Sequence, residues 1–236
     1  MDINTEPPQA SLQAMPSPRL LVASYNKLIL VHEADKRLKE QLASAGLNRN
    51  AFFVQLAPLF FNEGVTEQYA VCLVHRHYEL VDGERMVTNS SGNSTRPSID
   101  ESPNVVADSW LATGKAFEYR YTNHPGLFAP PSADFFAKFK AILDAYGIDT
   151  LGICSVPDVK KLGPGFTFLE MPGDHDRERV TEIVVGSLIA GNSLIYEVTW
   201  IAEKDSEGSF MLTCQCNCGN CKEPPPTKPP TKPPTK

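Results

Sequence analysis

The sequence predicts an α+β fold: a single domain with a mainly antiparallel mixed sheet and about two long helices. Apolar residues make up 42% of the 236 residues, which is enough to form a hydrophobic core. Two segments have apolar residues at helical spacing, and roughly seven others have the pattern of strands. The later strands follow one another without helices between them, which favours an antiparallel arrangement over a doubly wound sheet.

The two ends of the chain differ in composition from the middle. Residues 1–18 contain four prolines and no hydrophobic period, so we expect a disordered segment. Residues 223–236 form a Pro-Pro-Thr-Lys repeat, which predicts an extended, polyproline-like tail. The predicted folded domain therefore spans residues 19–222.

Two segments predict helices. The spacing of apolar residues predicts one over residues 24–45, with Gly46 suited to its left-handed end. The clearest pattern in the chain predicts another over residues 133–146. There Ser132 is suited to cap the start and Gly147 to end the helix.

The other apolar segments predict strands. Residues 69–80 alternate, with His75 and His77 on one face. The stretch 52–61 is apolar on all sides and predicts either a buried strand or a buried helical turn, while the polar stretch 89–103 predicts a loop. The remaining strands are predicted over residues 85–88, 116–122, 151–156, 166–171, 179–185, 194–202 and 209–216.

The densest chemical feature is a group of four cysteines near the C-terminus: Cys214, Cys216, Cys218 and Cys221. Thiolates suit zinc or copper(I), and the Cys-x-Cys and Cys-x-x-Cys spacings resemble those of metallothioneins. Two alternatives stay open. Leu212 and the first three sulfurs alternate along a strand and would then pack on its inner face, or the thiols serve redox or disulfide chemistry.

His75 and His77 form a second candidate site. Two imidazoles at i and i+2 on one strand face suit a single metal ion, and the pair resembles the His-x-His of the first cupin motif. A cupin has a carboxylate soon afterwards, but Glu79 and Glu84 do not match its spacing. The alternative is a pair that is solvated or hydrogen-bonded within the sheet. An enzyme site would need a third polar group, for which the candidates are Glu79, Glu118, Arg76 and His175.

A third candidate is Asp174-His175-Asp176, where a histidine between carboxylates would serve as a general base. The segment directly follows Pro172-Gly173, so an exposed polar turn is the favoured interpretation.

Composition also limits the partners and the compartment. The net charge of −6 argues against nucleic-acid binding, and no apolar stretch approaches the ~20 residues of a membrane span. The first residues lack a signal-peptide pattern, so we expect a cytoplasmic or nuclear protein that is not secreted. The tail contains a P-x-x-P pattern, which is typical of ligands for proline-reading domains.

Residues 72–77, Cys-Leu-Val-His-Arg-His, are followed by a Gly-Glu turn and a Met-containing strand over residues 82–87. This stretch resembles fungal-restricted proteins of unknown function, and the likeness spans residues 28–87. The resemblance implies a filamentous-fungal source and a single α+β domain, and it implies no catalytic residue.

Together these features predict a binding or accessory protein with a thiophilic metal, zinc or copper, at the C-terminal cysteines. The alternative is a metal-dependent or acid/base enzyme that acts on a small metabolite with His75 and His77 in its site.

Overall fold

The computed structural model describes residues 18–156, 162–163 and 165–219. The predicted end segments, 1–18 and 223–236, lie outside this part of the chain, except that Pro18 begins the first helix. The helices are α1 (Pro18–Tyr25), α2 (Val31–Ser44), α3 (Arg49–Asn62), η1 (Pro125–Phe128), α4 (Ala133–Ala145) and α5 (Gly186–Ile189). The strands are β1 (Tyr69–Leu73), β2 (Arg85–Thr88), β3 (Ser94–Ser98), β4 (Val105–Leu111), β5 (Ala116–Tyr121), β6 (Leu151–Ser155), β7 (Phe166–Pro172), β8 (Arg179–Val185), β9 (Ile195–Lys204) and β10 (Phe210–Gly219).

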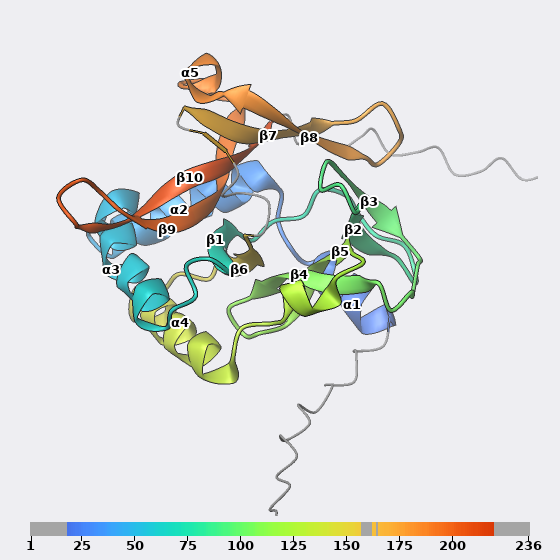
Figure 1. The fold of residues 1–236 in the computed structure, drawn as a ribbon, viewed down its shortest axis with the longest axis horizontal. Helices are drawn as coiled ribbons and strands as arrows, with labels where there is room; N and C mark the ends of the chain where they lie inside the picture. The colour runs from blue at the N-terminus through green and yellow to red at the C-terminus, as the bar shows by residue number, and fades with distance from the viewer. Residues whose placement is uncertain (1–17, 157–161, 164, 220–236) are drawn as a thin grey trace, which may run out of the picture.

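The ten strands close into one barrel in the order β1-β6-β4-β5-β2-β3-β8-β7-β10-β9 (Figure 1). Most neighbours are antiparallel, but β2–β5 and β7–β10 run parallel. The predicted α+β class with a mixed, mainly antiparallel sheet is confirmed. Its closure into a barrel was not predicted, because closure depends on pairings between strands that lie far apart in the sequence.

Three helices, α2, α3 and α4, lie on one side of the molecule (Figure 1), and α3 packs against β9 and β10. Aromatic rings join the layers: the Phe53 and Trp200 centroids lie 5.1 Å apart, and those of Phe60 and Phe135 5.3 Å apart. Of the two alternatives predicted for residues 52–61, the strand is wrong and the buried helical turn is found as part of a longer helix. This stretch belongs to the 14-residue α3, whose apolar residues point in all directions because α3 contacts the barrel, α2 and α4.

The predicted helix over residues 24–45 is interrupted, and α2 begins only at Val31. The side chain of Asn26 causes the break. It donates to the Leu80 carbonyl and accepts from the Leu80 amide, both at 2.8 Å, which ties the turn between α1 and α2 to a distant segment. Gly46 ends α2 with a φ of 72°, as predicted. The structure therefore contains three long helices, one more than predicted.

The predicted strand over residues 69–80 ends at Leu73. The Val74 amide still donates to the Thr150 carbonyl, in register with the pairing of β1 and β6. The Arg76 amide instead donates to the Ile29 carbonyl, so the chain leaves the β6 ladder after Val74. The polar stretch predicted as a loop contains β3, and β4 was not predicted. Both strands carry polar residues, Thr95 and Asp108, at buried positions where the sequence pattern of a strand requires apolar ones.

Helix α4 matches its prediction. The Ser132 side chain accepts a hydrogen bond from the Phe135 amide at 3.1 Å, and Gly147 has a φ of 66°. Each of the other predicted strands is also present: those over residues 85–88 and 179–185 have the predicted ends, and the rest end one to three residues away from them.

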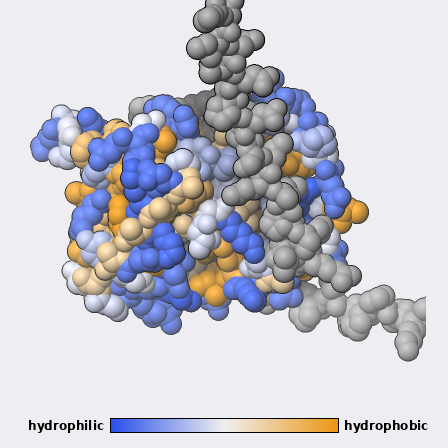
Figure 2. All heavy atoms as spheres, turned by 90° about the horizontal axis from the view of Figure 1, so that it is seen from below, coloured by the Kyte–Doolittle hydropathy of each residue, from blue (hydrophilic) through white to orange (hydrophobic). Residues whose placement is uncertain are grey.

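Most large apolar side chains are buried, and several of the exceptions lie on β8 and α5, where Ile183 is 59% and Leu188 80% exposed. Figure 2 shows a face on which hydrophilic and hydrophobic side chains are interspersed. Within the described residues, the helices are too short or too polar to cross a membrane.

Candidate functional site

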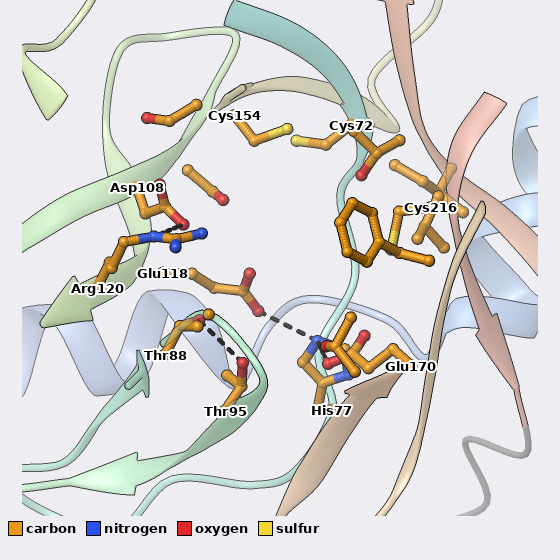
Figure 3. A pocket seen from close by; sticks show the side chains of 18 of the residues that line it. Cys72, His77, Thr88, Thr95, Asp108, Glu118, Arg120, Cys154, Glu170 and Cys216 are labelled. Carbon is orange, nitrogen blue, oxygen red and sulfur yellow. Dashed lines mark hydrogen bonds and ion pairs between the residues drawn. The ribbon is translucent and has the colours of Figure 1, made fainter. Parts of the chain in front are cut away.

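A cavity of about 160 Å³, lined by both polar and apolar side chains, lies among the strands of the barrel (Figure 3). Its lining includes charged side chains from three strands: Asp108 on β4, Glu118 and Arg120 on β5, and Glu170 on β7. His75 and His77 enter from the segment that follows β1. The barrel therefore brings together titratable groups that lie far apart in the sequence.

His75 is buried, with 6% of its surface exposed. Its Nδ1 lies 2.8 Å from the Leu73 carbonyl oxygen, which only accepts hydrogen bonds, so Nδ1 carries the proton and Nε2 the lone pair. Within the described residues, Nε2 has no hydrogen-bond partner. Burial, together with the neighbouring His77, lowers the pKa of His75 to about 4. The side chain therefore stays neutral and presents an unused nitrogen lone pair.

His77 is equally buried but lies between two carboxylates. Its Nε2 is 3.4 Å from Glu118 Oε1 and 3.6 Å from Glu170 Oε1. Burial alone would lower the pKa of His77, but the charges of Glu170 and Glu118 outweigh burial and raise that pKa above its ordinary value. The centroids of the two imidazole rings lie 4.7 Å apart. The pKa of His75 is therefore lowered while the pKa of its close neighbour His77 is raised.

Arg179 on β8 holds Glu170 in place. Its guanidinium is 2% exposed and donates through Nη2 to the carbonyls of Glu170 and Gly219, both at 2.8 Å. The same nitrogen lies 3.3 Å from Cys218 Sγ, and Arg179 Nε is 3.9 Å from Glu170 Oε1. This buried cation fixes the backbone of β7 and compensates the charge of Glu170.

Four side chains each bring one potential ligand atom into a group less than 4.8 Å across: His75, His77, Glu170 and Cys218. Cys218 is disulfide-bonded, so its sulfur is not available as a thiolate. The remaining donors are two imidazole nitrogens and one carboxylate oxygen. Two histidines with one carboxylate form a ligand set found in zinc and non-haem iron sites.

The fold brings together some of the site residues predicted from the sequence and separates others. Glu118, one of the candidate third groups, lies beside His77. Glu79 instead lies near Arg76, at 3.6 Å, with its side chain 75% exposed. His175 is exposed in the turn after Gly173 and does not line the cavity.

Sequence reasoning missed Glu170. The carboxylate that the His-x-His motif lacks nearby comes from β7, much later in the chain. A charged residue within the apolar run Phe166–Met171 was the available signal, because an ionised side chain on a buried strand needs a specific partner.

The structure shows Cys214, Cys216 and Cys218 on β10. Cys214 is paired with Trp200 and Cys216 with Thr199, with a register shift between them, so the predicted regular alternation is interrupted. Cys216 lines the cavity, and burial raises the pKa of Cys214 to about 12. Cys221 lies outside the described residues. Because the sulfur of Cys218 is in a disulfide, it does not offer a thiolate to the predicted four-cysteine site, and metal binding by the other cysteines of that site stays a prediction.

The depressed pKa of His75 predicts a loss of stability in acid. Below pH 6.5, the ordinary pKa of histidine, His75 is protonated in the unfolded chain, but in the folded protein it stays neutral down to about pH 4. Falling pH therefore favours unfolding across this window. Between about pH 7 and pH 4.5, wild-type protein should lose about 2 kcal/mol more than a His75→Gln variant, as measured by urea unfolding. Equal losses in both proteins would show that His75 is not held neutral by burial.

Neither a protein-family model, nor a curated protein, nor a solved structure matches the chain.

Proposed function

We propose that the protein is a metal-dependent enzyme that acts on a small polar metabolite inside the barrel. His75, His77 and Glu170 would hold one divalent transition-metal ion at the cavity wall. This is the alternative that the sequence left open. The observation that carries the proposal is the buried His75 Nε2, which has no hydrogen-bond partner among the described residues. A ring nitrogen of His75 lies within 4.8 Å of a ligand atom of His77 and of Glu170.

The orientation of His75 supports a role as a ligand. Histidines that bind metals commonly donate their second ring N–H to a carbonyl or carboxylate, which fixes the tautomer. The bond between His75 Nδ1 and the Leu73 carbonyl has this form. A buried nitrogen without a partner costs free energy, which a metal–nitrogen bond would offset.

The proposed ligand set would leave coordination positions of the metal ion open for a reaction. Three protein ligands leave further coordination positions on a divalent ion for water and substrate. The adjoining cavity carries charged groups and the Thr88 and Thr95 hydroxyls, which favour a polar substrate over an apolar one. Glu118, with 20% of its side chain exposed, supplies a carboxylate beside His77 that is suited to accept a proton from the substrate.

Calorimetric titration with zinc, on protein purified without a histidine tag, tests the proposal. Wild-type protein should bind one ion. His75→Ala and Glu170→Gln should each weaken binding by at least about a hundredfold, because each removes a direct ligand. His175→Ala, which changes an exposed histidine, is the matched control and should leave binding unchanged.

Circular dichroism on each variant separates lost binding from lost folding. Zinc that binds equally well to the folded His75→Ala and Glu170→Gln variants would overturn the proposal, as would wild-type protein that binds no divalent ion. Thermal-shift screening of zinc-loaded protein against small polar metabolites would then identify the substrate class.

A further inference from the structure

Thiols are concentrated at the same cavity. The described residues contain four free cysteines, of which Cys72, Cys154 and Cys216 line it and Cys214 does not. Cys72 and Cys154 lie on the neighbouring strands β1 and β6. Cys72 pairs with Gly152 and Cys154 with Ala70, so the two cysteines are diagonal neighbours on one face of the barrel wall.

The two side chains are directed toward each other. Figure 3 shows the sulfur atoms of Cys72 and Cys154 facing one another across the upper part of the cavity. Both residues are buried, with 6% and 9% of their surfaces exposed. Gly152, the residue paired with Cys72, lies beside the Cys72 sulfur: a Cβ atom at that position would be in contact with Cys72 Sγ at 3.4 Å.

We propose that Cys72 and Cys154 form a two-sulfur site for copper(I), separate from the His75, His77 and Glu170 group. Thiolate ligands favour this soft monovalent ion. Zinc, by contrast, takes four ligands in structural sites. Within the described residues, no group of three or more potential metal ligands includes this pair. The two sulfurs therefore suit an ion that needs only two ligands.

The surroundings of the pair favour a cation. The interaction with Cys154, together with burial, raises the pKa of the Cys72 thiol, and the negative charges of Glu118 and Asp108 raise it further. The same carboxylates that oppose a bare thiolate attract a positive ion to the sulfurs. When copper(I) binds, two Cu–S bonds form, two S–H bonds break and both protons leave to solvent. Copper keeps its oxidation state.

Anaerobic competition with the copper(I) chelator bicinchoninate tests this site. The protein receives copper(I) with ascorbate as the reductant, which leaves the disulfide of Cys218 intact. Wild-type protein should withhold one copper ion per chain from the chelator. Cys72→Ser and Cys154→Ser should each lose this binding, whereas Cys214→Ser, which changes a free cysteine outside the cavity lining, should retain it.

Cross-tests keep this proposal distinct from the proposed function. Cys72→Ser should still bind zinc, and His75→Ala should still bind copper(I). Copper(I) retained equally by the folded Cys72→Ser and Cys154→Ser variants would overturn the proposal and point to other thiols. A Cys72–Cys154 disulfide detected by mass spectrometry after mild oxidation, in protein that binds no copper(I), would overturn it in favour of a redox pair.

Discussion

Replacing Arg179 by Ala should lower the free energy of unfolding by about 3–5 kcal/mol, because the substitution leaves the buried charge of Glu170 without the arginine that compensates it, with only His77 beside it. Arg179 also bonds two backbone carbonyls where β7, β8 and β10 meet, so its loss disturbs three strands at once. Equilibrium unfolding in urea measures the change. The same variant should bind zinc more weakly, because Glu170 is no longer held in position.

Arg96→Ala is the matched control for Arg179. Arg96 lies on β3, the strand next to β8, and is exposed. Its replacement should change stability by no more than about 0.5 kcal/mol. If Arg179→Ala proved as mild as Arg96→Ala, Arg179 would not be the group that stabilises this corner of the barrel.

Replacing Gly152 by Ala should cost about 3 kcal/mol or prevent folding, although it adds a single methyl group. The new Cβ would lie 2.5 Å from the Trp110 carbonyl oxygen and 2.9 Å from Val74 Cγ2. Both neighbours belong to the barrel wall, and the carbonyl oxygen is backbone that cannot rotate away. Thermal and urea denaturation would report the loss.

Gly126→Ala separates this steric effect from the general effect of losing a glycine. A Cβ at Gly126 would meet no atom within 4 Å, and the residue is exposed. This variant should be neutral or slightly more stable, because alanine restricts the unfolded chain. Destabilisation of similar size at both positions would contradict the packing argument for Gly152.

The sequence predicted best those features that depend on neighbouring residues. Ser132 and Gly147 mark the ends of α4 because capping is local, and Gly46 ends α2 for the same reason. The break before α2 could not be predicted, because Asn26 is bonded to Leu80, more than fifty residues away. Closure of the barrel could not be predicted either, because it depends on the register between strands that are distant in the sequence.

The candidate site shows the same limit. His75 and His77 were identified because they lie two residues apart in the sequence, a spacing that suits one ion. Glu170 was not, because only the barrel brings β7 beside the segment that follows β1. The four C-terminal cysteines form a recognisable pattern in the sequence, whereas Cys72 and Cys154 are isolated there. Single cysteines carry no pattern until the pairing of β1 with β6 makes them neighbours.

X-ray absorption spectroscopy at the zinc edge tests the central claim most directly, because it reports which atoms bind the ion. On zinc-loaded wild-type protein, we expect only nitrogen and oxygen ligands at about 2.0–2.1 Å, with the outer-shell scattering of imidazole. In Glu170→Gln, occupancy should fall. A first shell dominated by sulfur at about 2.3 Å would instead place the ion among the cysteines and contradict the account.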